Sequence, residues 1–341
     1  MSYKFWTKIF IFTSIIFFIF SATFNYIINP YDIFKHNLFT SFIQIKNHSV
    51  SERMSTFYYI NNSKPTNLMI GTSRIGIFST NSVEKYLGKN TYNMSIPGAN
   101  IEEQTSYLRF MAYKHNIKNV IWALDFFSFN PDLKNDKSFT YDRVNPFKQI
   151  KDDHLIALFS LQTLKNSFKT LLDNINNKGP ILNRKQLKKN VNSMYLSLNK
   201  KDIEMRTNIQ INYYSNKFLK YTNFNNQDSI KINILKVKKI LDLYKEKNIN
   251  IYIYTSPVQD SFLDLYKKLG LEKTFLQWKK DLQTITPYTD FCTYNSISKE
   301  KTNFIDGTHI MPTFESMIFA KIFHDKSINI PSDFGIYKEK K

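Results

Sequence analysis

The sequence predicts an α/β protein built on a doubly wound parallel sheet, with a helical insertion and an N-terminal transmembrane helix. Short apolar runs alternate with longer segments of helical period. This alternation is typical of a parallel sheet that carries helices on both faces. A long stretch in the middle of the chain interrupts the alternation, and an uncharged apolar run lies near the N-terminus.

The N-terminal run indicates a membrane anchor. No charged residue occurs from Ile9 to Ile28, which approaches the roughly 20 apolar residues that cross a bilayer as a helix. Lys4 and Lys8 precede the run and favour a cytoplasmic N-terminus. We therefore expect residues 1–30 to anchor a single-pass membrane protein with its main domain periplasmic or otherwise extracytoplasmic. A cleaved signal peptide is the alternative, although the run is long for one and no small-residue cleavage site follows.

Residues 31–64 have mixed composition and are expected to form a linker to the α/β domain, which comprises residues 65–130 and 228–330. Each expected strand is a short apolar run, and several end at Gly, Pro or Ser, which favour turns. The expected strands are Asn67–Ile70, Thr91–Ile96, Val120–Leu124, Ile249–Tyr254 and Tyr288–Tyr294.

Helices are expected between these strands. One apolar stripe recurs at steps of three and four residues, as on a helix that faces a sheet. Its members are Ile230, Ile234, Val237, Leu241 and Tyr244. The other expected helices are Ser79–Tyr86, Ile101–His115 and Phe262–Leu282, the last with a break at Gly270.

Residues 131–227 are too many for a connection within a compact α/β domain. Leu155–Ile175 has a helical pattern, so we interpret the whole stretch as an inserted, largely helical subdomain. The last residues, 331–341, are expected to form a tail.

The composition restricts the partners. The single cysteine, Cys292, leaves no disulfide framework or thiolate metal cluster. The net charge of +19 has two interpretations: an anionic partner, or a chain that uses Lys for most surface charge, since its lysines are spread without a dense block. No zinc-finger, Walker or RNP-type motif is present, so nucleic acid is not an expected partner.

Candidate catalytic residues follow the expected strands. Ligands of doubly wound sheets bind at the carboxyl ends of the strands, where Ser73 follows the first strand and Asp306 and His309 lie beyond the fifth. A serine hydroxyl becomes a nucleophile when an imidazole takes its proton and a carboxylate orients that imidazole. The Asp-x-x-His spacing lets one turn present both partners. The backbone N–H groups of Ser73 and Gly98 are suited to hold an oxyanion.

These motifs resemble those of the SGNH (GDSL-like) hydrolase superfamily, and more narrowly its membrane-anchored cell-envelope branch. The resemblance covers Asn67–Asp125 and Ile249–Phe323. It implies a flavodoxin-like, SGNH-like domain and ester chemistry on acyl groups, with no metal and no organic cofactor. Its implied roles are Ser73 as nucleophile, His309 as base and Asp306 as orienting acid.

The resemblance also implies an oxyanion hole that includes Gly98, with Asn93 at a position where the family often has Asn. Two positions depart from the pattern: Thr72 replaces an Asp before the serine, and Asp125 stands where the family supplies an Asn donor. A carboxylate cannot donate to an oxyanion. Three alternatives remain: backbone donors alone, substitution by Asn100, or a structural pairing of Asp125 with Arg74, which could otherwise clamp an anionic substrate.

The expected function is acyl transfer or ester hydrolysis on a cell-envelope polysaccharide, or another acyl-ester substrate, through a Ser73 acyl-enzyme. A membrane acyl-donor protein is a candidate partner. The alternative is a catalytically degenerate relative that binds glycan or acts as a scaffold for such a partner. The departures at Thr72 and Asp125 favour this alternative.

Overall fold

The computed structural model describes residues 3–36, 38, 52–148, 152–176, 195, 197–220, 224 and 227–341. The chain forms two compact units. The N-terminal unit comprises Met1–Ser63, Ser138–Arg143 and Phe147–Asn190, and the sheet unit comprises Lys64–Lys137, Val144–Pro146 and Val191–Lys341.

The sheet unit contains a six-stranded, mostly parallel sheet in the order β2-β1-β3-β4-β5-β6. Strands β1 to β5 run parallel, and β6 pairs antiparallel with β5. Their bounds are β1 Asn67–Gly71, β2 Thr91–Ser95, β3 Asn119–Leu124, β4 Asn250–Thr255, β5 Tyr288–Asp290 and β6 Ile336–Lys338. The five expected strands are present, although the fifth ends at Asp290 and not at Tyr294. The expected C-terminal tail is wrong in part, because residues 336–338 close the edge of the sheet as β6.

Helices and short 3₁₀ turns connect the strands of the sheet unit. They are α3 Ser73–Gly76, α4 Asn81–Leu87, α5 Ile101–Lys114, η2 Phe126–Phe129, α9 Lys200–Lys217, α10 Gln227–Glu246, α11 Asp260–Lys268, α12 Glu272–Ile285, α13 Ser296–Lys299, η4 Lys301–Asn303, η5 Pro312–Phe314 and α14 Glu315–Ile322. The expected break at Gly270 is confirmed: this residue has φ +70° and separates α11 from α12.

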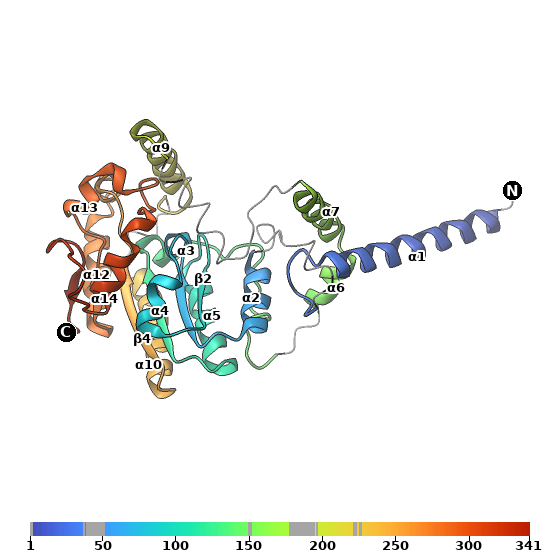
Figure 1. The fold of residues 1–341 in the computed structure, drawn as a ribbon, viewed down its shortest axis with the longest axis horizontal. Helices are drawn as coiled ribbons and strands as arrows, with labels where there is room; N and C mark the ends of the chain where they lie inside the picture. The colour runs from blue at the N-terminus through green and yellow to red at the C-terminus, as the bar shows by residue number, and fades with distance from the viewer. Residues whose placement is uncertain are drawn as a thin grey trace. The chain divides into compact units, whose positions relative to one another are not determined.

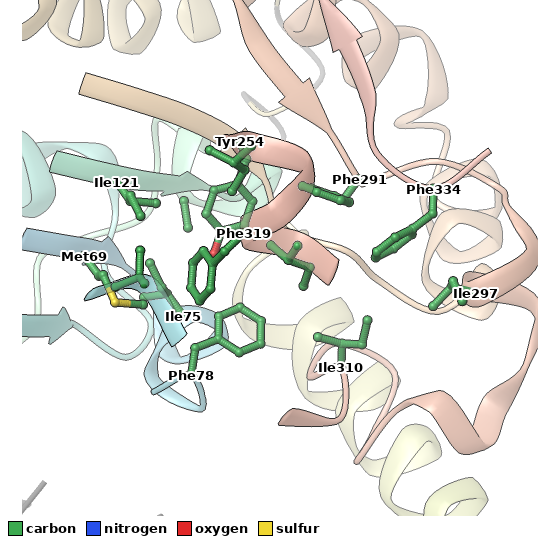
Figure 2. Packing of buried hydrophobic residues seen from close by; sticks show 14 of the residues in the cluster. Met69, Ile75, Phe78, Ile121, Tyr254, Phe291, Ile297, Ile310, Phe319 and Phe334 are labelled. Carbon is green, nitrogen blue, oxygen red and sulfur yellow. The ribbon is translucent and has the colours of Figure 1, made fainter. Parts of the chain in front are cut away.

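Helices pack on both faces of the sheet because its side chains alternate in direction along each strand. On one face, Met69, Ile121 and Tyr254 form a buried apolar cluster with Phe319 of α14 (Figure 2). On the other face, the indole N–H of Trp122 donates to Gln104 Oε1 of α5 at 2.8 Å. Burial on both faces explains why the central strands β1 and β3 are almost continuously apolar.

The N-terminal unit is helical. It contains α1 Tyr3–Ile28, α2 Glu52–Ser63, α6 Asp152–Phe159 and α7 Leu161–Ile175, and the end of α1 packs against α6 and α7 (Figure 1). Helix α1 has 26 residues and a mean hydropathy of 1.9 over its most apolar part. It is the one helix among the described residues that is long and apolar enough to cross a membrane, a criterion that a signal sequence also meets.

Two expected boundaries differ from the structure. The expected linker, residues 31–64, contains α2, and residues 37 and 39–51 lie outside the described part. The expected insertion, residues 131–227, is divided between the units, because α7 buries polar side chains against α1 whereas α9 buries Ile203 against Ile305 of the sheet unit.

Gly71→Ala should destabilise the sheet unit, because a Cβ atom at this position would lie 2.8 Å from Ala123 Cβ and 3.0 Å from its carbonyl oxygen on β3. Overpacking of this kind costs about 1–3 kcal/mol. Denaturant unfolding of the full chain in detergent measures the loss. A second Ala123→Gly substitution removes the closest atom, so the double variant should lose less than the sum of the two single variants; strict additivity would contradict this account.

Candidate active site

The nucleophile candidate Ser73 begins α3 directly after β1. Thr72 caps this short helix, since its hydroxyl accepts a hydrogen bond from Arg74 N. Asn93 of β2 fixes the far side of the turn by donating to Ile75 O at 2.8 Å and Phe78 O at 2.9 Å. Asn93 thus acts on the backbone of the turn that carries Ser73.

The loop that carries Asp306 and His309 is a tight hairpin. Phe304 and Ile310 form an antiparallel bridge, and Ile305 N donates to His309 O at 2.8 Å. Gly307 lies against the Phe262 ring of α11 so closely that any Cβ atom would overlap it. The backbone of this loop is therefore fixed on both sides.

The structure brings Ser73, His309 and Asp306 into one line of hydrogen bonds. The distance from Ser73 Oγ to His309 Nε2 is 2.9 Å, and His309 Nδ1 lies 2.8 Å from Asp306 Oδ2. The carboxylate of Asp306 can only accept, so the proton of the neutral imidazole is inferred to be on Nδ1 of His309. Nε2 is then free to accept a hydrogen bond from the Ser73 hydroxyl. This geometry meets the requirement for an activated serine.

The carboxylate of Asp306 is almost completely buried, at 6% exposure. Burial alone would raise its pKa, but the charge and hydrogen bond of His309 and the hydrogen bonds from Thr308 outweigh that effect, and the pKa is lowered overall. The Thr308 backbone N–H donates at 2.7 Å and the His309 backbone N–H at 3.0 Å. Asp306 is thus held in its ionised form, as an orienting acid requires.

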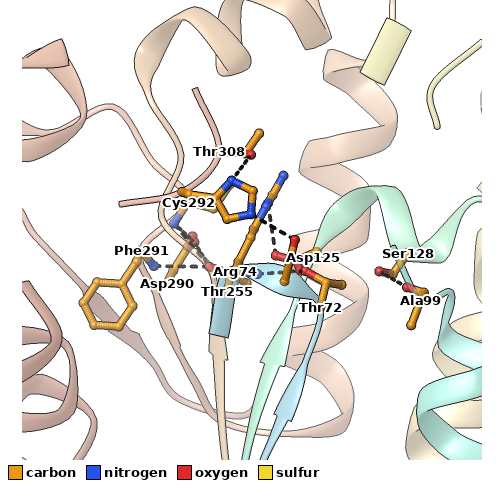
Figure 3. Close-up of polar contacts among 12 residues, drawn as sticks. Thr72, Arg74, Ala99, Asp125, Ser128, Thr255, Asp290, Phe291, Cys292 and Thr308 are labelled. Carbon is orange, nitrogen blue, oxygen red and sulfur yellow. Dashed lines mark hydrogen bonds and ion pairs between the residues drawn. The ribbon is translucent and has the colours of Figure 1, made fainter. Parts of the chain in front are cut away.

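The two positions that depart from the SGNH pattern contact each other. Thr72 Oγ1 donates to Asp125 Oδ2 at 2.5 Å, and Arg74 Nη1 donates to Asp125 Oδ1 at 3.0 Å (Figure 3). The exposed fractions of the Arg74 and Asp125 side chains are 3% and 0%. Of the alternatives for Asp125, the structure has the pairing with Arg74, which connects the ends of β1 and β3.

Arg74 points into the protein. Its guanidinium lies 5.4 Å from the centroid of the Phe127 ring and 5.6 Å from that of Tyr214. Its Nε and Nη2 atoms are buried and have no hydrogen-bond partner among the described residues. Of the two roles considered for Arg74, the structure therefore has the pairing with Asp125 and not a clamp for an anionic substrate, because its charge is neutralised by Asp125 and shielded from solvent.

Gly98 lies at the expected place in the turn after β2 and has φ +65°, a conformation that favours glycine. Ile96 N donates to Gly71 O at 2.8 Å, which ties this turn to the nucleophile turn. The carbonyl of Ala99 accepts from Ser128 Oγ at 2.7 Å (Figure 3). Both turns that carry the expected oxyanion N–H groups are thus supported by hydrogen bonds.

Asn100 does not offer a donor to the site. Its amide nitrogen donates to Leu133 O at 2.7 Å and to Asn135 Oδ1 at 2.9 Å, while its side-chain oxygen caps α5 by accepting from Glu103 N. Both amide hydrogens are occupied, which argues against the expected oxyanion role. Backbone groups remain as the oxyanion donors among the alternatives considered.

Sequence reasoning missed the wall that α9 contributes. Tyr214 and Phe218 are buried against Phe127, with ring centroids 5.3 and 4.6 Å from it, and Phe218 lies 3.4 Å from the position of a Cβ atom at Gly98. Thr207 lies beside Gly307 in the same way. All three residues belong to the stretch that matched no known sequence pattern. The i, i+4 spacing of Tyr214 and Phe218 was the only local sign that one helix face packs against the sheet unit.

No protein-family model matches the chain, and no curated protein matches it either. Within the described ranges, no group of three or more His, Cys, Asp or Glu side chains is arranged to hold a metal ion.

Asp306→Asn should weaken the dependence of stability on acid. The lowered pKa means that the ionised carboxylate stabilises the fold above the usual Asp value of about 4. This contribution is lost as the pH falls through the lowered pKa. The difference in free energy of unfolding between wild type and variant should therefore be largest near neutral pH and shrink below pH 4, as measured by denaturant titration at a series of pH values. Asp242→Asn, in an exposed pair with Lys238, is the control and should leave the pH profile unchanged.

Asp125→Leu should cost about 3–5 kcal/mol, because it leaves the buried Arg74 guanidinium without its counter-ion. The double variant Arg74→Met, Asp125→Leu removes both charges and should recover much of that loss. Denaturant unfolding of the two single variants and the double variant gives the coupling energy. Additive losses would mean that the pair contributes no mutual stabilisation.

Proposed function

We propose that this protein is a membrane-anchored serine enzyme that transfers or hydrolyses acyl esters through Ser73, His309 and Asp306. The observation that carries the proposal is the 2.9 Å contact between Ser73 Oγ and His309 Nε2, with Asp306 at 2.8 Å behind the imidazole. A serine on a fixed turn, a base in hydrogen-bond reach and a buried acid that orients the base are the parts of an activated nucleophile.

The finer fold assignment is part of the same proposal. The strand order 2-1-3-4-5 of the parallel strands is that of a flavodoxin-like sheet, in which ligands bind at the carboxyl ends of the strands. Ser73 follows β1 and Gly98 follows β2, as in the SGNH pattern that the sequence resembles. These agreements support an SGNH-like domain.

In the proposed reaction, Ser73 Oγ attacks the carbonyl carbon of an acyl ester and gives its proton to His309 Nε2. The tetrahedral oxyanion accepts hydrogen bonds from the backbone N–H groups of Ser73 and Gly98. The ester bond breaks, and His309 returns the proton to the leaving alcohol, which produces the Ser73 acyl-enzyme. An acceptor hydroxyl, from water or from a sugar, then attacks the acyl carbon and gives its proton to His309. The bond from the acyl carbon to Ser73 Oγ breaks, and His309 returns the proton to Ser73 Oγ, which releases the acylated acceptor and the free serine.

The proposed oxyanion hole has no side-chain donor, because Asp125 is paired with Arg74 and Asn100 is a helix cap. One missing donor costs about 10²–10³ in rate. A slow transferase is compatible with that loss.

We place the site outside the cytoplasm and assign it an O-acylated envelope polysaccharide as substrate. The support is the apolar helix α1 with Lys4 and Lys8 at its start, the net charge of +19, and the resemblance to the cell-envelope branch of the superfamily. The same features suit a membrane acyl-donor protein as partner.

Labelling by a fluorophosphonate and hydrolysis of p-nitrophenyl acetate test the proposal on the full chain in detergent. Wild type should be labelled at Ser73, and Ser73→Ala should abolish both labelling and turnover. Asp306→Asn should keep the serine but lower kcat by about 10⁴, as loss of the orienting acid does in other triads.

Ser327→Ala is the matched control, since this serine lies on an exposed turn where it bonds to Asp325. It should be labelled and turn over ester like wild type. Absence of labelling in the wild type, with a folded protein, would instead favour the degenerate glycan-binding or scaffold function.

A further inference from the structure

The contact between α1 and α7 has its polarity reversed relative to a water-soluble helical bundle. Helix α7 is strongly amphipathic, yet the face that it buries is polar. Its buried residues are Thr163, Asn166, Ser167, Thr170 and Asn174. Helix α1 shows the same reversal where the two helices meet, because Ser21 and Asn25 are buried there while most of its apolar side chains are exposed.

Hydrogen bonds between the helices satisfy part of this polar interior, while the hydroxyls of Ser21 and Thr170 are buried without a hydrogen-bond partner among the described residues. Asn25 Nδ2 donates to Leu158 O of α6 at 2.8 Å, and Ser167 Oγ of α7 donates to Asn25 Oδ1 at 2.8 Å. Asn166 Nδ2 donates to the Tyr31 hydroxyl at 2.5 Å. Short polar side chains that bond across helices are typical of helix packing in membranes.

Seven apolar side chains of α6 and α7 face outward. Their exposed fractions run from 46% to 71%, which is unusual for side chains of this size in a folded protein. They are Leu155, Ile156, Phe159, Leu161, Phe168, Leu172 and Ile175. On α7 the apolar positions recur at steps of three and four, so they form one continuous stripe.

This exposed stripe is costly in water, since burying an apolar side chain of this size is worth about 1.5–3 kcal/mol. The stripe meets α1 within the same compact unit, because the rings of Phe168 on α7 and Phe24 on α1 lie 4.7 Å apart between centroids. Lys165 and Lys169 are exposed on α7. On the helical wheel they fall beside the stripe, as in helices that lie at a bilayer surface with their lysines among lipid headgroups.

We propose that α6 and α7 are a second membrane contact, with their apolar faces in the acyl-chain boundary of the leaflet that contains the C-terminal end of α1. At 1.5 Å per residue, 15 residues of α7 extend about 22 Å, which is less than the roughly 30 Å of a bilayer core. The helices therefore lie in the interface and do not span. The inference rests on insertion of α1, and not on acyl chemistry.

Spin labels on the full chain in phosphatidylcholine–phosphatidylglycerol nanodiscs test the contact. Burial raises the pKa of the Cys292 thiol to about 12 and makes it a poor nucleophile. Its replacement by Ala removes any residual labelling and leaves a background without cysteine. Single cysteines then replace Phe168 or Leu172 on the stripe. Gln162, an exposed polar position of the same helix, is the matched control, and Phe12 reports on α1.

Labels at 168 and 172 should be relaxed by oxygen and protected from an aqueous nickel chelate, as the label at 12 should be. The label at 162 should show the reverse preference. Circular dichroism of each labelled chain controls for folding.

Two results would overturn the inference. Access of nickel to 168 and 172 would mean that the stripe faces water, and low access to both relaxants would mean that a protein, such as a second copy, covers it. If the label at position 12 is relaxed by oxygen but the labels at 168 and 172 are not, the membrane contact of α6 and α7 is rejected while the proposed anchor stays intact. Because the readout does not depend on ester turnover, failure of the proposed chemistry is detected separately.

Discussion

The candidate site depends on one buried carboxylate. Asp306 is nearly inaccessible to water, and a buried charge is tolerated only when it is paired and hydrogen-bonded. It meets this requirement by accepting from the backbone of Thr308 and His309 and from the imidazole. The same bonds fold the loop and orient His309 towards Ser73. The local structure and the proposed chemistry thus have a single physical origin.

The ends of the neighbouring strands are held by a second buried charge. Asp125 binds both Thr72 and Arg74, which flank the nucleophile in the sequence. The nucleophile turn therefore rests on an ion pair in a region of low dielectric, where such bonds are strong and their removal is costly. This arrangement gives Thr72 and Asp125 a shared structural role, since the hydroxyl of Thr72 donates to the carboxylate of Asp125.

The sheet unit and the contact between α1 and α7 follow opposite rules of polarity. In the sheet unit, apolar side chains of β1, β3 and β4 are buried beneath helices, as expected for a domain in water. In the N-terminal unit, polar side chains of α1 and α7 are buried and apolar ones are exposed. The proposed bilayer contact accounts for this difference, because lipid is the better solvent for an apolar helix face.

The sequence alone predicted the five parallel strands, the break at Gly270 and the apolar span of α1. Each of these features depends on local periodicity or on a single residue type. It also singled out Ser73, Asp306 and His309 by type and order. Their distances depended on the tertiary structure, because strand pairing brings residues 236 positions apart within hydrogen-bond reach. Tertiary contacts likewise decided that Asn100 caps a helix, that Asp125 pairs with Arg74 and that α9 lines the site. Local sequence could not specify these outcomes, because the hydrogen-bond and ion-pair partners of these residues come from distant parts of the chain.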